Sequence, residues 1–290
     1  MSRLSRLLRS RRRVAPPEPR FTAPFEHLLH VPRYELQAET VAGDTLLIPD
    51  GASFYASYRE IFTEQKYRFQ AAGTTPRIVD CGANCGLSVL YFKQLFPAAE
   101  VVAVEADPHI FRMLQWNIRQ RGMRGVTLVN KAVAVGSEFV TFHREGADAG
   151  RIHALCDAKE QLTVPIVVLD DLLVEPVDLL KIDIEGSETD VVCSSNRLST
   201  VSQIILEYHS FADHEQSLQR VLSKLAEHGF RYYLQTQYCP ARPLVEHDCH
   251  LGMDLQVNVF AKRPIQIATA GGMHESPLCQ SPPDDPARAA

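Results

Sequence analysis

The chain has 290 residues, of which 45% are hydrophobic, so it is long enough to bury the core of one large α/β domain or of two small ones. The formal net charge of −5 argues against nucleic-acid binding by the chain as a whole, and no apolar run reaches the ~18 residues that a membrane-spanning helix needs. The seven cysteines are odd in number and form no C-x-x-C motif, so we expect reduced thiols and a cytoplasmic location.

Both ends of the chain have compositions that favour disorder. Residues 1–20 are rich in arginine and proline, and no apolar segment follows the arginines as it would in a secretory signal. A solvated head is the favoured interpretation, and weak contact with anionic lipid or a transit peptide are the alternatives. Residues 264–290 are rich in Pro, Ala, Ser and Asp and are expected to form a disordered tail. Residues 21–75 would then be a lead-in segment that packs on a main domain at residues 76–263.

Strand and helix patterns alternate along the main domain. Strands are predicted at residues 77–81, 101–105, 126–129, 132–142, 164–168, 178–183, 203–208, 230–234 and 255–261, and helices at 88–96, from 108 onward and at 215–228. Asp107 is placed to cap the helix that Pro108 opens. The alternation predicts a mostly parallel sheet with helices on both faces. Ligands bind such sheets at the carboxyl ends of the strands, and acidic residues close four of them here: Asp80, Glu105, Asp183 and Glu207.

The turn after the first of these strands, D-x-G-x-N-x-G at residues 80–86, is the most informative segment. Gly82 can adopt a positive φ and lets a ligand approach the backbone, and Asn84 is the next best residue for a left-handed conformation. Gly86 allows close packing where the following helix begins. The spacing differs from the G-x-G-x-x-G of dinucleotide folds. Asp80 would repel a pyrophosphate but suit a ligand with an ammonium group, such as the methionine end of S-adenosylmethionine.

Glu105 supplies the acidic partner of this loop. It follows Asp80 by 25 residues, near the ~20-residue offset at which an acidic side chain accepts hydrogen bonds from ribose hydroxyls. The loop and the acid together predict a nucleoside-cofactor site. The alternative is that the glycines only turn a loop and that Glu105 caps a helix.

Several motifs between residues 48 and 262 also occur together in one known family. They lie at residues 78–86, 104–108, 117–118, 168–172 and 178–188, with Glu60-Ile61-Phe62 and Tyr67 upstream. In these motifs the sequence resembles the FkbM family of methyltransferases, although Ala106 stands where a proline is frequent.

The resemblance implies a class I methyltransferase (Rossmann-like) α/β fold, with a mostly parallel seven-stranded sheet and helices on both faces. It also implies methyl transfer from S-adenosylmethionine, most often to a hydroxyl oxygen. The residues expected to bind the cofactor are Tyr67, Asp80, Gly82, Ala83, Asn84, Gly86, Glu105 and Ala106.

A hydroxyl acceptor must lose its proton, so a base or a metal should lie near the acceptor oxygen. Asp183, Glu207 and His209 are the candidates, because they lie at the ends of neighbouring strands. His209 has an ordinary pKa near neutrality and is the natural base. Asp183 and Glu207 could instead hold a divalent cation such as Mg²⁺, or could orient His209. The structural alternatives are helix capping by Asp183 and Glu185, a Glu207–Lys181 ion pair and a buried structural histidine.

The expected function is therefore methylation of a hydroxyl on a sugar, a polyketide or another small metabolite, without a nucleic-acid partner. Two other classes stay open. A Rossmann-fold oxidoreductase that uses NAD or a nucleotide sugar would require a phosphate-binding glycine loop. A non-catalytic, methyltransferase-like binding module would be indicated by loss of the glycines or of Glu105, and all of these are present. A further group, His247, Cys249 and His250, lacks a distant partner pair and supports a metal site only weakly.

Overall fold

The structure is a computed structural model that describes residues 25–136, 138–147, 150–152 and 160–264. The predicted head at residues 1–20 and all but the first residue of the predicted tail lie outside the described residues. None of the helices in the described ranges combines the length and the hydropathy that a membrane span requires.

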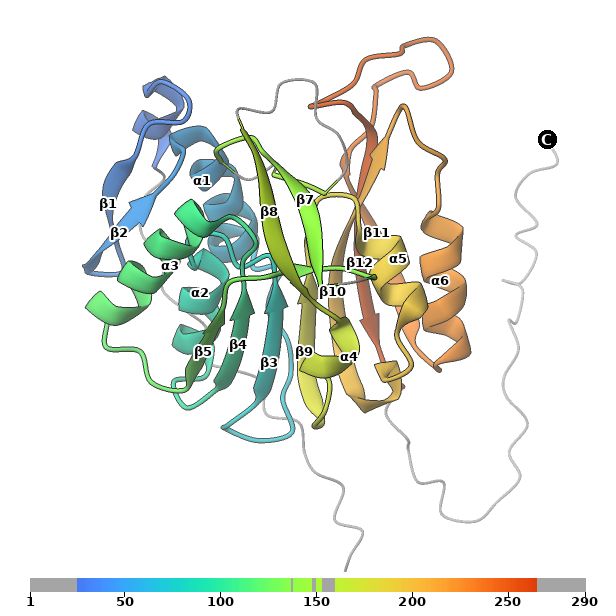
Figure 1. Ribbon diagram of the computed structural model, residues 1–290, viewed down its shortest axis with the longest axis horizontal. Coiled ribbons are helices and arrows are strands. Elements are labelled where there is room, and N and C mark those ends of the chain that lie inside the picture. The colour runs from blue at the N-terminus through green and yellow to red at the C-terminus, as the bar shows by residue number, and fades with distance from the viewer. Residues whose placement is uncertain (1–24, 137, 148–149, 153–159, 265–290) are drawn as a thin grey trace, which may run out of the picture.

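A seven-stranded sheet forms the centre of the molecule (Figure 1). Its strands, in the spatial order β11-β12-β10-β9-β3-β4-β5, are parallel except that β12 runs antiparallel to both of its neighbours. This confirms the mostly parallel seven-stranded α/β fold. The chain order reverses between β3 and β9, and such a switch point is where open α/β sheets bind ligands. The strands are β3 (Arg77–Cys81), β4 (Glu100–Val104), β5 (Val126–Val129), β9 (Val177–Ile182), β10 (Val201–Phe211), β11 (Arg231–Tyr238) and β12 (Met253–Lys262).

Helices cover both faces of the sheet, as the alternating pattern predicts (Figure 1). Successive strand residues point to opposite faces, so Ile78 packs into one hydrophobic core and Val79 into the other. The Ile78 side holds α1 (Gly51–Tyr58), α2 (Leu87–Leu95) and α3 (Pro108–Gln120), and the Val79 side holds α4 (Leu169–Leu172), α5 (Glu188–Ser194) and α6 (Leu218–Glu227). A short 3-10 helix, η3 (Leu198–Thr200), precedes β10. Asp107 caps α3 as predicted, because its Oδ1 accepts a hydrogen bond from the backbone N–H of His109 at 2.7 Å. Such a cap contributes about 1 kcal/mol.

The prediction of a single strand at residues 132–142 is wrong. β6 (Ala132–Val133) ends before Gly136, whose φ of +128° breaks the extended run, and β7 (Phe139–Arg144) begins after it. These two strands flank β8 (Glu160–Val167) in a separate three-stranded sheet, so none of the three joins the central sheet. Ala106 packs against a cluster of Ala132, Phe142 and Val164 from this small sheet, which places the sheet beside the turn that follows β4.

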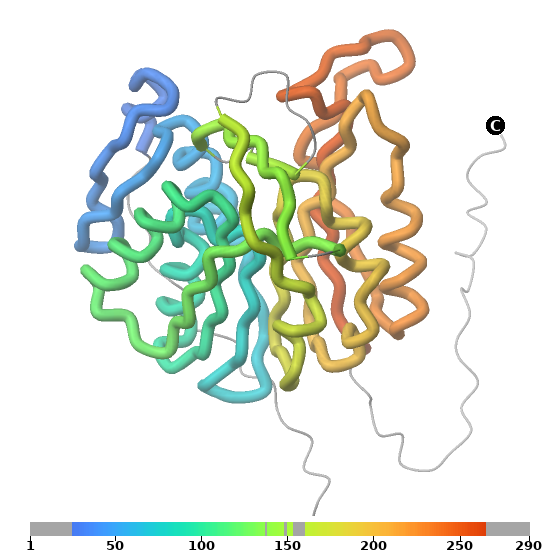
Figure 2. Tube along the Cα trace, in the orientation of Figure 1, coloured from blue at the N-terminus to red at the C-terminus, as the bar shows by residue number. Residues whose placement is uncertain are grey.

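Residues 25–63 pack along one side of the domain, beside α2 and α3 (Figure 2). Tyr58 stacks on Phe62 at 4.8 Å between ring centroids, and Phe62 meets Tyr91 of α2 edge-on at 5.2 Å. Asn117 of α3 is buried, and its side-chain amide bonds the backbone of Leu47 in both directions and the carbonyl of Cys85. These contacts tie the segment to the loop after β3. Its elements are η1 (Glu26–His30), β1 (Gln37–Val41), β2 (Asp44–Ile48), α1 and the π-helical turn η2 (Arg59–Thr63).

Candidate active site

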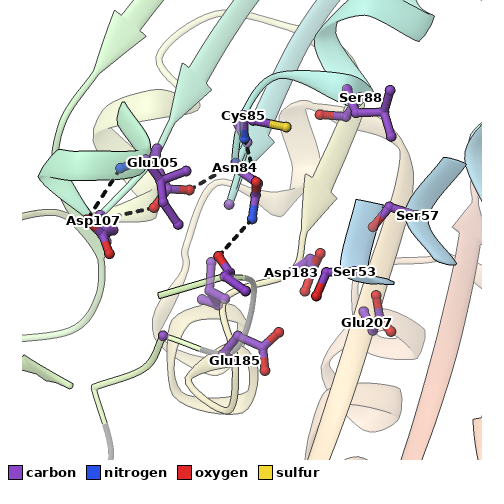
Figure 3. Close-up of a pocket in the computed structure, with 18 of the residues that line it drawn as sticks. Ser53, Ser57, Asn84, Cys85, Ser88, Glu105, Asp107, Asp183, Glu185 and Glu207 are labelled. Atoms are coloured by element: carbon purple, nitrogen blue, oxygen red, sulfur yellow. Dashed lines mark hydrogen bonds between the residues drawn. The ribbon is translucent and has the colours of Figure 1, made fainter. Parts of the chain in front are cut away.

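A cavity of about 300 Å³ opens at the carboxyl ends of the central strands, which is at the small end of the range for ligand pockets. Glu105 lies on one side of it, and Asp183 and Glu207 lie on the other (Figure 3). Ser53 and Ser57 of α1 form part of its wall. The cavity therefore spans the loop after β3 and the acidic strand ends that the sequence singles out.

The loop after β3 has the backbone conformations that its sequence predicts. Gly82 has a φ of +85°, Asn84 of +47° and Gly86 of +95°. A Cβ on Gly82 would lie 1.8 Å from the carbonyl oxygen of Asp183, so this glycine is required by the contact between the loop and the end of β9. Gly86 allows close packing, since a Cβ there would lie 2.7 Å from the side chain of Leu114 in α3. Ala83 and Asn84 line the cavity beside these glycines.

Glu105 clamps this loop to the start of α3. Its Oε2 accepts a hydrogen bond from the backbone N–H of Asn84 at 2.9 Å, and its Oε1 accepts one from Asp107 at 2.8 Å. Burial raises the pKa of Glu105 to about 7, although the two backbone N–H groups oppose this shift. Ala106 follows it at the cavity wall. Each oxygen of a carboxylate can accept a second hydrogen bond, so Glu105 can still accept one from a ligand.

Asp80 is fully buried rather than exposed to the cavity. Its Oδ2 accepts a hydrogen bond from Ser88 Oγ at 2.5 Å, and its Oδ1 lies 3.4 Å from Lys181 Nζ. Asp80 can therefore act on a bound ligand through Lys181. Tyr67 is almost completely buried at the cavity edge, and burial raises the pKa of its phenol.

Lys181 connects the two sides of the cavity. Its Nζ donates to the carbonyl of Gly82 at 2.5 Å and lies 3.2 Å from Asp183 Oδ2. Burial disfavours the ammonium, but Asp183 and Asp80 hold the pKa of Lys181 above its usual value. The ion pairs of Lys181 are thus with these two residues rather than with Glu207. The sequence carried a signal for this role, because a lysine within the apolar run of β9 needs buried partners.

Asp183, Glu207 and His209 gather at the far side of the cavity, because β9 and β10 pair in parallel with Ile182 opposite Leu206. His209 Nε2 lies 4.0 Å from Asp183 Oδ1. Gln256 of β12 donates a hydrogen bond to Glu207 Oε1 and lies 3.4 Å from His209 Nε2.

Two further carboxylates belong to this group: Glu185, which the sequence suggested only as a helix cap, and Glu188, for which it suggested no role. Glu188 Oε1 lies 2.9 Å from His209 Nδ1, and Glu185 Oε2 lies 3.6 Å from Nε2. Both belong to the acidic run D-I-E-G-S-E that follows β9, which was the available signal. The carboxylate that joins Asp183 and His209 within metal-ligand spacing is Glu185, whereas the sequence had suggested Glu207. In the part of the chain that the structure describes, this is the one such group, and His247, Cys249 and His250 do not form another.

The charges around His209 favour its protonated form. Burial disfavours the imidazolium, but Glu185 and Glu188 raise the pKa of His209 well above its usual value. Burial also raises the pKa of Glu207 to about 8, and the nearby Asp183 adds to the shift. An imidazolium cannot accept a proton, so His209 could act as a base only after losing one. Glu207 is the alternative base, because a pKa of about 8 leaves a fraction of its carboxyl ionised near neutral pH.

A family model described as "Methyltransferase FkbM domain" matches residues 80–232, which is more than half of the chain. The chain is 26% identical over 233 residues to the 31-O-demethyl-FK506 methyltransferase FkbM of Streptomyces tacrolimicus, covering 64% of this chain and 88% of that protein. It is 27% identical over 191 residues to the methyltransferase sdnD of Sordaria araneosa, covering 51% and 74%.

Two solved structures show weaker likeness. A methyltransferase FkbM from Methylobacillus flagellatus KT is 16% identical with a TM-score of 0.38, covering 64% of this chain and 44% of that one. The M. jannaschii TYW2 in complex with AdoMet is 13% identical with a TM-score of 0.45, covering 81% and 89%. At these TM-scores the two structures carry no inference about function.

Proposed function

The chain belongs to the FkbM family of S-adenosylmethionine-dependent methyltransferases, and from this premise we propose that it methylates a hydroxyl oxygen of a small, polar metabolite. The observation that carries the proposal is the continuity of the cavity. One space joins the loop at Gly82 and Glu105 to the carboxylates Asp183 and Glu207. A methyl donor and an acceptor hydroxyl can therefore meet within it.

The residues of the cavity fit S-adenosylmethionine chemically. Ile110, Val133 and Phe142 line the cavity with apolar surface, which suits an adenine ring, and Glu105 suits the hydroxyls of its ribose. Asp183 and Glu207 place two carboxyl groups on the opposite side (Figure 3). When bound there, the cofactor supplies a methyl carbon attached to a positively charged sulfonium.

The remaining task for the protein is to position the acceptor and to take its proton. Glu207 is suited to this step, because its pKa of about 8 lies near the working pH. Asp183 could act in the same step, since it is the more exposed of the two carboxylates. Ser53 and Ser57 lie one helical turn apart on α1 and could hydrogen-bond further hydroxyls of the acceptor. This polar and acidic lining favours an uncharged polyhydroxyl compound, such as a sugar, over an anionic acceptor.

The oxidoreductase alternative is wrong, because the chain belongs to a methyltransferase family. A non-catalytic member of the family would keep the cofactor site and lack turnover. It differs from the proposed enzyme in one measurable property, which is transfer of the methyl group.

A screen with S-adenosylmethionine labelled in the methyl group tests the proposal. Small-molecule fractions of a lysate are incubated with the wild-type chain and with Glu207→Gln, and labelled products are separated and identified. We expect a labelled methyl ether with the wild-type protein and at least a hundredfold less with the variant. Binding of S-adenosylhomocysteine without product in any fraction would indicate a non-catalytic module. Label on nitrogen or sulfur would contradict the hydroxyl assignment.

A further inference from the structure

Three side chains beside the cavity surround a gap that no direct hydrogen bond between them closes. His209 Nε2 lies 3.6 Å from Glu185 Oε2 and 4.0 Å from Asp183 Oδ1, and one ligand atom from each residue lies within 4.8 Å of the other two. Direct N–H···O hydrogen bonds would be about 2.7–3.2 Å long. Ligands that each lie about 2.0–2.2 Å from one metal ion are separated by roughly 3–4 Å, and the two distances from His209 Nε2 to the carboxylates fall in this range.

A buried carboxylate holds His209 on the side away from the gap. Glu188 and His209 are both about 1% exposed, and Glu188 Oε1 lies 2.9 Å from His209 Nδ1. The same carboxylate accepts hydrogen bonds from the backbone N–H of Gly186 at 3.0 Å and of Ile184 at 3.3 Å, the two residues that flank Glu185. One buried carboxylate thus fixes the imidazole and the turn that carries Glu185. A carboxylate on the far nitrogen of a histidine is the usual outer support of a metal ligand.

The group is also open on one side. The side chains of Asp183 and Glu185 are 25% and 16% exposed and line the cavity, whereas that of His209 is buried beneath them. Lys181 Nζ holds Asp183 Oδ2 at 3.2 Å, which leaves Oδ1 on the side of His209. Gln256 Nε2 also lies near His209 Nε2, at 3.4 Å. An ion in the gap would be reached from the cavity and would keep coordination positions for water or a substrate oxygen.

We propose that Asp183, Glu185 and His209 bind a divalent first-row transition-metal ion, of the Mn²⁺ or Zn²⁺ class, with Glu188 as the outer support of the histidine. One imidazole nitrogen with two carboxylate oxygens suits these ions better than Mg²⁺, which prefers oxygen ligands alone. Glu207 is not a ligand in this site. The site therefore differs from the Asp183–Glu207 pair that the sequence suggested as cation ligands. The role of the ion rests on the proposed function: it would lower the pKa of the acceptor hydroxyl. Binding of the ion does not depend on that function.

Titration of Mn²⁺ into the full-length protein, followed by the loss of the free-ion signal in electron paramagnetic resonance, tests the site. Zn²⁺ binding is measured in parallel by calorimetry. We expect one ion per chain with the wild-type protein. Glu185→Gln and His209→Ala should weaken binding at least tenfold, and Glu188→Gln should weaken it by about 10- to 100-fold.

Glu60→Gln is the matched control, because it removes one carboxylate charge from the same cavity but outside the proposed ligands. It should change metal affinity by less than twofold. Affinity for S-adenosylhomocysteine, measured for every variant, verifies that each protein is folded. The proposal is overturned if the wild-type protein binds neither ion while it binds S-adenosylhomocysteine. It is equally overturned if Glu60→Gln weakens binding as much as Glu185→Gln. Metal binding without methyl transfer would leave this site standing and refute the proposed function.

Discussion

Replacing Gly82 by alanine should destabilise the whole domain, because the residue lies between two strand ends. The new Cβ would lie 1.8 Å from the carbonyl oxygen of Asp183, so the ends of β3 and β9 would have to separate. The positive φ adds about 1–2 kcal/mol of strain for any residue with a Cβ. Separation would break the hydrogen bonds from Asp183 N to Cys81 O and from Lys181 to Gly82 O, at about 1 kcal/mol or more each. The expected loss in the free energy of unfolding is therefore about 3–5 kcal/mol.

Gly43→Ala provides the control for backbone strain. Gly43 has a φ of +93° in the β1–β2 turn, but no atom lies within 4 Å of where its Cβ would be. It should lose only about 1–2 kcal/mol. Urea denaturation of both variants measures the difference, and calorimetry should find S-adenosylhomocysteine binding impaired in Gly82→Ala alone. A Gly82→Ala protein within 1 kcal/mol of Gly43→Ala would falsify the reasoning, because it would mean that the strand ends accommodate the methyl group without cost.

Three further predictions concern the residues around the loop. Because burial raises the pKa of Glu105 to about 7, its carboxyl is mainly protonated at pH 6 and ionised at pH 8. Affinity for S-adenosylhomocysteine should rise by up to about tenfold between these pH values, and calorimetry of Glu105→Gln should show a flat profile. Asn117→Ala leaves buried backbone groups of Leu47 and Cys85 without hydrogen-bond partners, so the free energy of unfolding, measured in urea, should fall by about 2–4 kcal/mol. A loss below 1 kcal/mol would contradict the role of Asn117 in joining residues 25–63 to the loop after β3. Phe62→Ala removes the ring that lies between Tyr58 and Tyr91 and should lower the free energy of unfolding by about 3–5 kcal/mol in the same urea assay. The conservative exchange Ile61→Leu in the same turn should lower it by less than 1.5 kcal/mol.

Features that depend on a few neighbouring residues were predictable from the sequence. The strand at residues 77–81 and the cap of Asp107 on α3 occur as predicted, because an apolar run and a capping side chain act within their own segment. The left-handed conformations of Gly82 and Asn84 follow from the same local preferences. The prediction of a single strand at residues 132–142 was wrong because the positive φ of Gly136 interrupts the run of strand-forming residues. The second part of the run then pairs with β8 as β7.

The site shows where local reasoning ends. The sequence placed Asp80 and Asp183 at strand ends. In the β3–β9 register, however, Asp80 lies opposite Lys181, so its carboxylate is buried in an ion pair with that lysine. The sequence paired Asp183 with Glu207, yet the turn at Glu185, with its φ of +56°, brings a different carboxylate beside His209.

The sequence alone determined the order of strands and helices along the chain, because apolar periodicity differs between the two. It also determined the edge of the sheet at which the site lies, because ligands bind parallel sheets at the carboxyl ends of the strands. Only the tertiary structure decided which charged groups meet. The contact of Lys181 with Asp80 depends on the register between β3 and β9, which lie far apart in the chain, and the contact of Glu188 with His209 depends on the placement of α5 beside β10. A shift of one residue in the strand register would turn Lys181 to the opposite face of the sheet from Asp80.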